Sequence, residues 1–439
     1  MKTASATIIL LASLVFPASR AGAQLMVAPT MTLDNSEISR QAPNTLLLGT
    51  GTGFSYDSNA SNSQPPVSGV QYTVYPQIGL SLARPRWNAL ISVTPGVSYG
   101  SSNIPQSQLL SLTAGVALQY RASPKLLLSF LNDFVSSTNP FDSFSTGPIS
   151  NPGTSLSGGG VPTDYLPRTN ERAATGAVYS LNARTSLTAT GSYNYISYQF
   201  DSSLPPEAQP FQQSATGQWS IGVIRRSSPR YSGGILYVGQ QIDSGEGRLK
   251  TLDQSVQYSL QFAPTSTLQI SGMIGPEYVR SSYAGILGGG NIGDVVNQRS
   301  AGWSWTGSAG ATWTHGKYQL SGNAAQVLSM GNQYQGSVRQ ILINGDLHRR
   351  LAGKAELDVF GGYSINKPIF LAQSLPRFSN NYLSTGARVS KTIADHWNLS
   401  LTYWYLVQSE PQGTHQLYSG DHSRVAITLS YSIAKPLRK

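Results

Sequence analysis

The sequence is low in charged residues, has no cysteine and has no long apolar run after its first residues. Asp, Glu, Lys and Arg make up 11% of the 439 residues, whereas typical globular domains carry about 25%. A water-soluble surface of this size would need more charge. The absence of cysteine excludes disulfide bonds and thiolate metal sites. Polar or charged residues interrupt every apolar stretch beyond residue 23. A transmembrane helix needs about 20 consecutive apolar residues, and no later segment is that long.

The N-terminus has the features of an export signal. Lys2 supplies a positive start, residues 6–16 are apolar and uncharged, and Ala21-Gly22-Ala23 offers a small-residue cleavage site. We therefore predict a signal peptide over 1–23 and a mature N-terminus at Gln24. A short periplasmic segment over 24–44 would follow it. The lack of cysteine is compatible with an oxidising compartment outside the cytoplasm.

From residue 45 to residue 433 the chain repeats one pattern. Segments of about 10 to 15 residues alternate apolar and polar positions, which is the period of a strand with two different faces. In 110–120 the apolar face is formed by Leu110, Leu112, Ala114, Val116, Leu118 and Tyr120. In 255–262 it is formed by Val256, Tyr258, Leu260 and Phe262. A helix would space its apolar residues by three and four, so these segments are predicted to be strands.

The connectors between these strands fall into two classes that alternate. Short turns rich in Pro, Gly, Ser, Asn and Asp occur at 84–86, 122–124, 182–184, 227–229, 264–266, 315–316, 351–353 and 394–396. The second class is polar and mostly longer, at 57–68, 100–107, 138–169, 201–212, 244–247, 281–299, 330–335, 367–379 and 410–420. These connectors join about eighteen strands and put both termini on the short-turn side. Sixteen strands is the main alternative, if one hairpin is over-read.

A closed transmembrane barrel accounts for this pattern better than a large secreted β-sandwich or solenoid. Lipid cannot hydrogen-bond to backbone groups, so only a sheet closed on itself leaves no open edge in the hydrocarbon. Short turns on one side, longer loops on the other and an even number of strands are typical of such barrels. The predicted fold is therefore an all-β, antiparallel up-and-down barrel over 45–433, with a periplasmic C-terminal tail over 434–439.

On this pattern the chain resembles the Gram-negative outer-membrane porin class, and within it the loosely defined β-barrel porins of exopolysaccharide-producing bacteria. The stripe of Val425, Ile427, Leu429, Tyr431 and Ile433 resembles the C-terminal strand by which the assembly machinery recognises outer-membrane proteins. The chain departs from that pattern because it continues to Lys439 instead of ending on an aromatic residue. The resemblance covers nearly all of the mature chain and rests on no motif.

Seven charged residues lie on the polar faces of the predicted strands: Asp133, Asp253, Glu277, Glu356, Asp358, Arg388 and Arg424. An outward arginine at the membrane midplane would cost about 2–4 kcal/mol, so these charges are predicted to face the lumen. Carboxylates and guanidiniums that face one another across a narrow pore would set an ion preference. The alternative is that they neutralise one another and hydrate the wall, and the sequence does not decide between the two.

Aromatic residues gather towards the strand ends, where amphipathic rings favour the headgroup zones. They are Trp87, Tyr99, Tyr120, Tyr179, Tyr198, Tyr231, Trp303, Trp313, Tyr318, Tyr363, Tyr382 and Trp397. Trp404 is the best candidate for an inward aromatic ring, and a single ring does not make a stacking track for sugars. The longest connector, 138–169, is either a third loop that folds into the lumen, as the porin resemblance implies, or a solvent-exposed loop.

Signatures of enzymes and of cofactor sites are absent from the sequence. The five histidines, which fall in or beside connectors, have neither metal-ligand spacing nor a recognisable nucleophile beside them. Gly288-Gly289-Gly290 is not followed by a helix, so it does not predict a phosphate cradle. The net charge of +10 is too diffuse to indicate nucleic-acid binding. We therefore expect no enzymatic activity, no metal and no cofactor.

The sequence thus favours a passive channel for small hydrophilic solutes in the bacterial outer membrane. About eighteen strands enclose a water-filled lumen, whereas eight leave room only for side chains. The first alternative is a non-enzymatic barrel that serves polysaccharide export or surface attachment, and the second is an enzyme at the rim that acts on lipid or peptide. The expected partners are outer-membrane lipid, lipopolysaccharide, the barrel assembly machinery and the solutes themselves. The pattern leaves the oligomeric state open, a homo-oligomer included.

Overall fold

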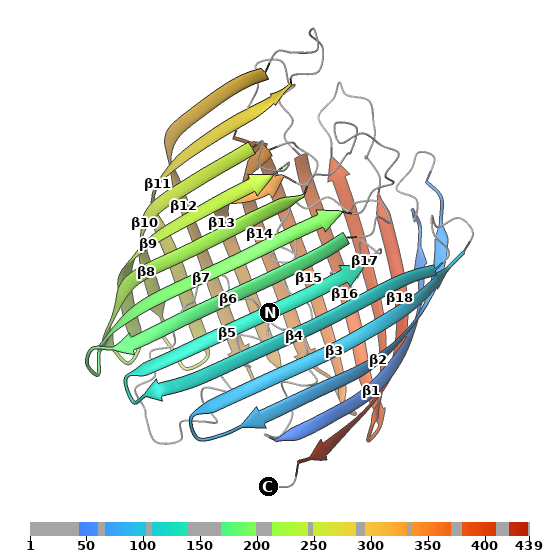
Figure 1. The fold of residues 1–439 in the computed structure, drawn as a ribbon. Coiled ribbons are helices and arrows are strands. Elements are labelled where there is room, and N and C mark those ends of the chain that lie inside the picture. The colour runs from blue at the N-terminus through green and yellow to red at the C-terminus, as the bar shows by residue number, and fades with distance from the viewer. Residues whose placement is uncertain are drawn as a thin grey trace.

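The computed structural model describes residues 44–59, 66–101, 108–137, 168–198, 213–244, 249–286, 295–331, 336–369, 380–409 and 421–437. This part of the chain forms 18 β-strands (Figure 1). They are β1 Thr45–Asp57, β2 Gly69–Ala83, β3 Trp87–Gly100, β4 Gln108–Ser123, β5 Leu126–Ser137, β6 Arg168–Ser180, β7 Thr185–Tyr198, β8 Ser214–Ser228, β9 Tyr231–Ser244, β10 Leu249–Phe262, β11 Leu268–Ile286, β12 Val295–His315, β13 Tyr318–Gly331, β14 Gly336–Arg350, β15 Ala355–Pro368, β16 Asn380–Ala394, β17 Trp397–Ser409 and β18 His422–Pro436.

Each strand pairs antiparallel with its neighbours in the sequence, and the sheet closes because β1 pairs with both β2 and β18. The β1–β18 register runs from Thr45↔Pro436 to Asp57↔Arg424. Two further backbone hydrogen bonds extend this seam, from Leu437 to Asn44 and from Ser58 to Ser423. The prediction of an eighteen-stranded up-and-down barrel is confirmed, and the alternative of sixteen strands is wrong.

The short turns predicted from the sequence join the strands at the lower rim in Figure 1. Gly316 and Gly353 take the left-handed conformation there, with φ of 56° and 68°, as tight turns require. The prediction of a long loop over 281–299 is wrong, because β11 continues to Ile286 and β12 begins at Val295. These two strands pair along their whole described length, from Leu268↔Trp313 to Ile286↔Val295, so their own hairpin extends far into the expected loop.

The distribution of polar and apolar residues on the two faces of the sheet is the reverse of that in a soluble protein. In β10 the polar residues Thr251, Ser255 and Gln257 are buried, whereas Val256 and Tyr258, which alternate with them, are exposed. The same inversion recurs around the barrel, with exposed outward residues that include Ile78, Leu110, Ile221, Ile235, Ile274, Ile343, Leu401 and Ile427. An apolar exterior around a polar interior is typical of barrels that cross a membrane. Among the described residues no helix is long and apolar enough to cross a membrane.

Aromatic rings mark both ends of the exposed face. Outward and exposed are Tyr99, Tyr120, Tyr179, Trp303, Trp313, Tyr318, Tyr363 and Trp397. On β12, Trp313 lies near the short-turn end and Trp303, which is 76% exposed, lies towards the other end. Tyr198 was expected among them, but it is buried and points inward, where it packs against Ile242 and Leu328. The side chain of Tyr382 lies outside the described residues.

A charge on the outer face is expected to destabilise the barrel more than the same charge on the inner face. Leu401→Arg, at an exposed position of β17, should lower the free energy of unfolding by about 2–4 kcal/mol, because the guanidinium enters hydrocarbon. Ser400→Arg, the adjacent inward position, is the matched control and should cost less. Urea unfolding in lipid vesicles, followed by tryptophan fluorescence, measures both. Equal losses would contradict the assignment of the two faces.

Candidate functional site: the inner face of the barrel

The structure places the seven candidate charges on strand faces that alternate with the exposed apolar residues. Asp253, Glu277, Asp358 and Arg424 are buried, and Asp133, Glu356 and Arg388 are half-buried. They come from strands β5, β10, β11, β15, β16 and β18 and therefore surround the interior instead of forming one cluster. Most of them lie against a partner on a neighbouring strand.

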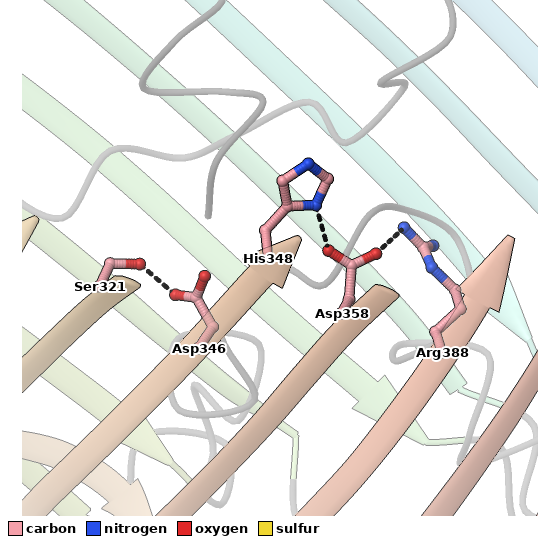
Figure 2. Close-up of polar contacts among 5 residues, drawn as sticks. All are labelled: Ser321, Asp346, His348, Asp358 and Arg388. Carbon is pink, nitrogen blue, oxygen red and sulfur yellow. Dashed lines mark hydrogen bonds and ion pairs between the residues drawn. The ribbon is translucent and has the colours of Figure 1, made fainter. Parts of the chain in front are cut away.

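Near the short-turn end, polar contacts join residues of β13, β14, β15 and β16 (Figure 2). Oδ1 of Asp358 lies 2.7 Å from Nδ1 of His348, and Oδ2 of Asp358 accepts a hydrogen bond of 3.2 Å from Arg388. On the next strands, the Ser321 hydroxyl donates to Asp346. Asp358 thus lies between a histidine of β14 and an arginine of β16, and its charge is balanced by the guanidinium.

Two carboxylates lie further towards the loop end of the wall, on β10 and β11. Glu277 is 2% exposed and accepts a hydrogen bond of 2.7 Å from Arg339 of β14. Asp253 lies within electrostatic range of both Glu277 and Arg339. Arg339 is therefore the cation that offsets the mutual repulsion of this acidic pair.

Two other interior charges lie on seams between adjacent strands. Asp133 stands directly opposite Arg172 in the β5–β6 register and interacts with it electrostatically. Arg424 donates to the Ser55 hydroxyl at 3.1 Å and to Oε1 of Gln71 at 3.4 Å. It therefore joins β18 to β1 and β2 across the closure of the barrel.

Trp404 points inward, as expected. Its ring lies 5.9 Å from the guanidinium carbon of Arg424, within the range of a cation–π contact. Trp404 thereby belongs to the same seam as Arg424, and it is a single ring on the inner wall.

Within the described strands, the pairing of the wall is interrupted between β12 and β13. These strands pair only from Gly307↔Gln326 to His315↔Tyr318, although both continue beyond that point. Gln326 makes the last hydrogen bonds between the two strands. Its side-chain amide donates to the Trp305 backbone carbonyl, and its backbone carbonyl accepts from the Thr306 hydroxyl. Above this point β13 and β14 remain paired with each other as far as Gly331↔Gly336. The upper part of this hairpin therefore leaves its place beside β12.

The upper β13–β14 hairpin rests against the inner face of β7, β9, β10 and β11. Leu328, 5% exposed, packs with Ile196, Tyr198 and Ile242. The Ser337 hydroxyl donates to Oγ1 of Thr251 at 2.8 Å, and Arg339 binds Glu277. Leu328, Ser337 and Arg339 lie on the face that points outward lower in the same strands, where Leu320 and Ile343 are exposed. The hairpin thus forms a second layer inside the barrel and narrows it.

Sequence reasoning missed this inward hairpin and its residues. The signal available was the run from Val338 to Ile343, in which apolar residues occupy both faces, as expected for a strand buried on both sides. The loop that was expected to enter the lumen, 138–169, lies outside the described residues except for Arg168 and Thr169. Within the described chain, no group of three or more His, Asp or Glu side chains is arranged to hold a metal ion.

Comparisons with known proteins give similarity only at the level of three-dimensional structure. No protein-family model and no curated protein sequence matches the chain. Acinetobacter baumannii OccAB2 superposes with a TM-score of 0.43 at 12% identity, over 89% of this chain and 98% of that one. Pseudomonas aeruginosa OpdK with vanillate gives 0.41 at 11% identity, over 89% and 99%. The ferric citrate transporter FecA gives 0.44 at 9%, over 90% and 79%. Similarities this low do not bear on what this barrel does.

Engineered cysteines test the position of the hairpin, because the chain has none of its own. Thr251→Cys with Ser337→Cys should form a disulfide bond, since the two native hydroxyl oxygens lie 2.8 Å apart. The control pair is Trp305→Cys with Leu328→Cys, which would face each other if the β12–β13 register continued upward from Gly307↔Gln326. Gel mobility without reductant measures both. A bond in the control pair alone would place the hairpin in the wall.

Removal of the Asp358 carboxylate should destabilise the β14–β16 wall. Asp358→Asn removes the negative charge and replaces one of the two acceptor oxygens by an amide donor, so that either His348 or Arg388 loses its acceptor, and the expected loss of unfolding free energy is about 1–3 kcal/mol. Asp395→Asn, in an exposed turn, should change it by no more than about 0.5 kcal/mol. Urea unfolding measures both variants, and equal effects would show that Asp358 is not stabilised by its neighbours.

Proposed function

We propose that this barrel is a passive channel in the bacterial outer membrane for small hydrophilic solutes. The observation that carries the proposal is the inverted character of the wall, with apolar side chains exposed outside and polar or charged side chains inside. Closed barrels of about sixteen to eighteen strands enclose an aqueous lumen. Hydrophilic solutes would find hydrogen-bonding partners along this inner face.

The inward hairpin fits such a channel, because a constriction gives a wide barrel its size limit. An ion pair, a hydroxyl contact, a hydrogen bond from Gln240 and an apolar cluster fix the hairpin against β7, β9, β10 and β11. A solute would pass between this second layer and the remaining wall. Outer-membrane lipid and lipopolysaccharide would surround the apolar exterior, after insertion by the barrel assembly machinery.

The arrangement of the wall charges favours a role in hydrating the lumen over a role in creating an electric field across it. Glu277 and Asp358 each bind an arginine of another strand, and Asp133 faces Arg172. Because these carboxylates are matched by neighbouring cations, they contribute little net charge. A transverse field from the other wall charges stays a prediction.

Purified, refolded protein in a planar lipid bilayer tests the proposal. We expect discrete, stable conductance steps, because a fixed lumen passes ions at a constant rate. Protein denatured by heating is the control and should produce none. If correctly folded barrel, verified by its heat-dependent gel mobility, inserts and stays silent, the channel proposal fails.

A further inference from the structure

The short-turn rim carries a concentration of cations that the channel proposal does not use. Twelve exposed lysine and arginine side chains lie in the turns or at the adjacent strand ends: Arg84, Arg86, Lys125, Arg184, Arg225, Arg230, Lys317, Arg349, Arg350, Lys354, Lys391 and Lys435. Among the described residues at this end, one exposed carboxylate accompanies them, that of Asp395. The rim is therefore strongly positive.

These cations are not neutralised by neighbours within the described chain. The arginines of two ion pairs in the described chain, Arg339 and Arg388, lie inside the barrel, away from the turns. None of the twelve rim cations takes part in an ion pair with a described carboxylate. Their contacts are of other kinds, such as the hydrogen bond from Arg84 to Asn44 and the stacking of Arg349 over Tyr318. Arg225, Arg349, Lys391 and Lys435 lie on the outward face of their strands, and the charge of the other eight acts on the solution at the mouth.

The rim cations are distributed around the mouth instead of gathered at one side. Six of the eight short turns contain at least one, namely those after β2, β4, β6, β8, β12 and β14. Eighteen strands about 4.8 Å apart and tilted by about 40° give a barrel radius of about 18 Å. A ring of this size raises the local concentration of anions over the whole opening when screening is weak.

We propose that the short-turn mouth collects anions, so that the solutes this channel favours are small molecules bearing carboxylate, phosphate or sulfate groups. This inference rests on the proposed channel function and adds the class of solute. Selection at the mouth follows from the contrast between its unpaired cations and the paired charges of the wall. It also has a signature that wall charges lack, because charges exposed to solvent are screened by salt and buried pairs are screened much less.

The test is the anion-to-cation permeability ratio, taken from the reversal potential of single channels in a KCl gradient. It is measured around 0.01 M, where the screening length is about 30 Å, and around 1 M, where it is about 3 Å. The native barrel should favour chloride strongly at low salt and only weakly at high salt. The same measurement with sodium benzoate and sodium phosphate extends the result to organic and phosphate anions.

A variant with four turn cations reversed, Arg86→Glu, Arg184→Glu, Arg230→Glu and Lys317→Glu, should lose most of the low-salt preference, a several-fold fall in the ratio. The matched control reverses four exposed cations away from this rim, Lys250→Glu, Arg280→Glu, Arg299→Glu and Lys367→Glu, and should keep it. Both should retain native heat-dependent mobility and open-channel conductance near 1 M salt.

The outcomes separate this inference from the channel proposal. Conductance with no anion preference at low salt, or with a preference that the rim variant retains, overturns the anion inference and leaves the channel intact. A preference that persists unchanged near 1 M salt assigns selection to the wall and also overturns it. Absence of conductance in the folded native protein contradicts the channel proposal itself.

Discussion

Closure between β1 and β18 is the constraint on which the rest of this structure depends. The two strands are separated by almost the whole sequence, yet they pair from Thr45↔Pro436 to Asp57↔Arg424. Without that seam both strands would present a row of unpaired backbone groups to hydrocarbon, where each costs several kcal/mol. Arg424 reinforces the seam from inside through Ser55 and Gln71. The polar interior and the apolar exterior both follow once the sheet is closed.

The departure of the β13–β14 hairpin from the wall is compatible with this constraint. β12 and β13 pair from Gly307↔Gln326 to His315↔Tyr318, which is close to the length of about 9–11 residues that a tilted strand needs to cross the hydrocarbon. Trp303 and Trp305, 76% and 63% exposed, follow just above, where rings favour the interface. The wall therefore opens at the level where water can satisfy the freed backbone groups, and the hairpin can enter the lumen.

Much of the fold could be predicted because its cause is local. Alternation in segments such as 255–262 determines which side chain faces lipid, and the turn-forming residues determine where each strand reverses. The inward hairpin and the Glu277–Arg339 pair could not be predicted. Glu277 and Arg339 come from strands that are not neighbours in the sheet, and alternation fixes the face of a residue without fixing its height or its neighbour across the barrel. Tyr198 illustrates a second error of the sequence analysis. Its position near a strand end suggested that it belongs to an aromatic girdle, but its side chain points into the barrel.

The sequence by itself, which left eighteen or sixteen strands open, therefore determined the strand pattern, the direction of the two faces and the seven charges on the polar face. These follow from a period of two residues and from the cost of exposing polar backbone to lipid. Only the tertiary structure decided that the hairpin of β13 and β14 folds inward, that Arg339 reaches Glu277, and that the rim cations form a ring. The physical reason is that closure and strand tilt bring together residues far apart in the chain, and no local pattern encodes those distances.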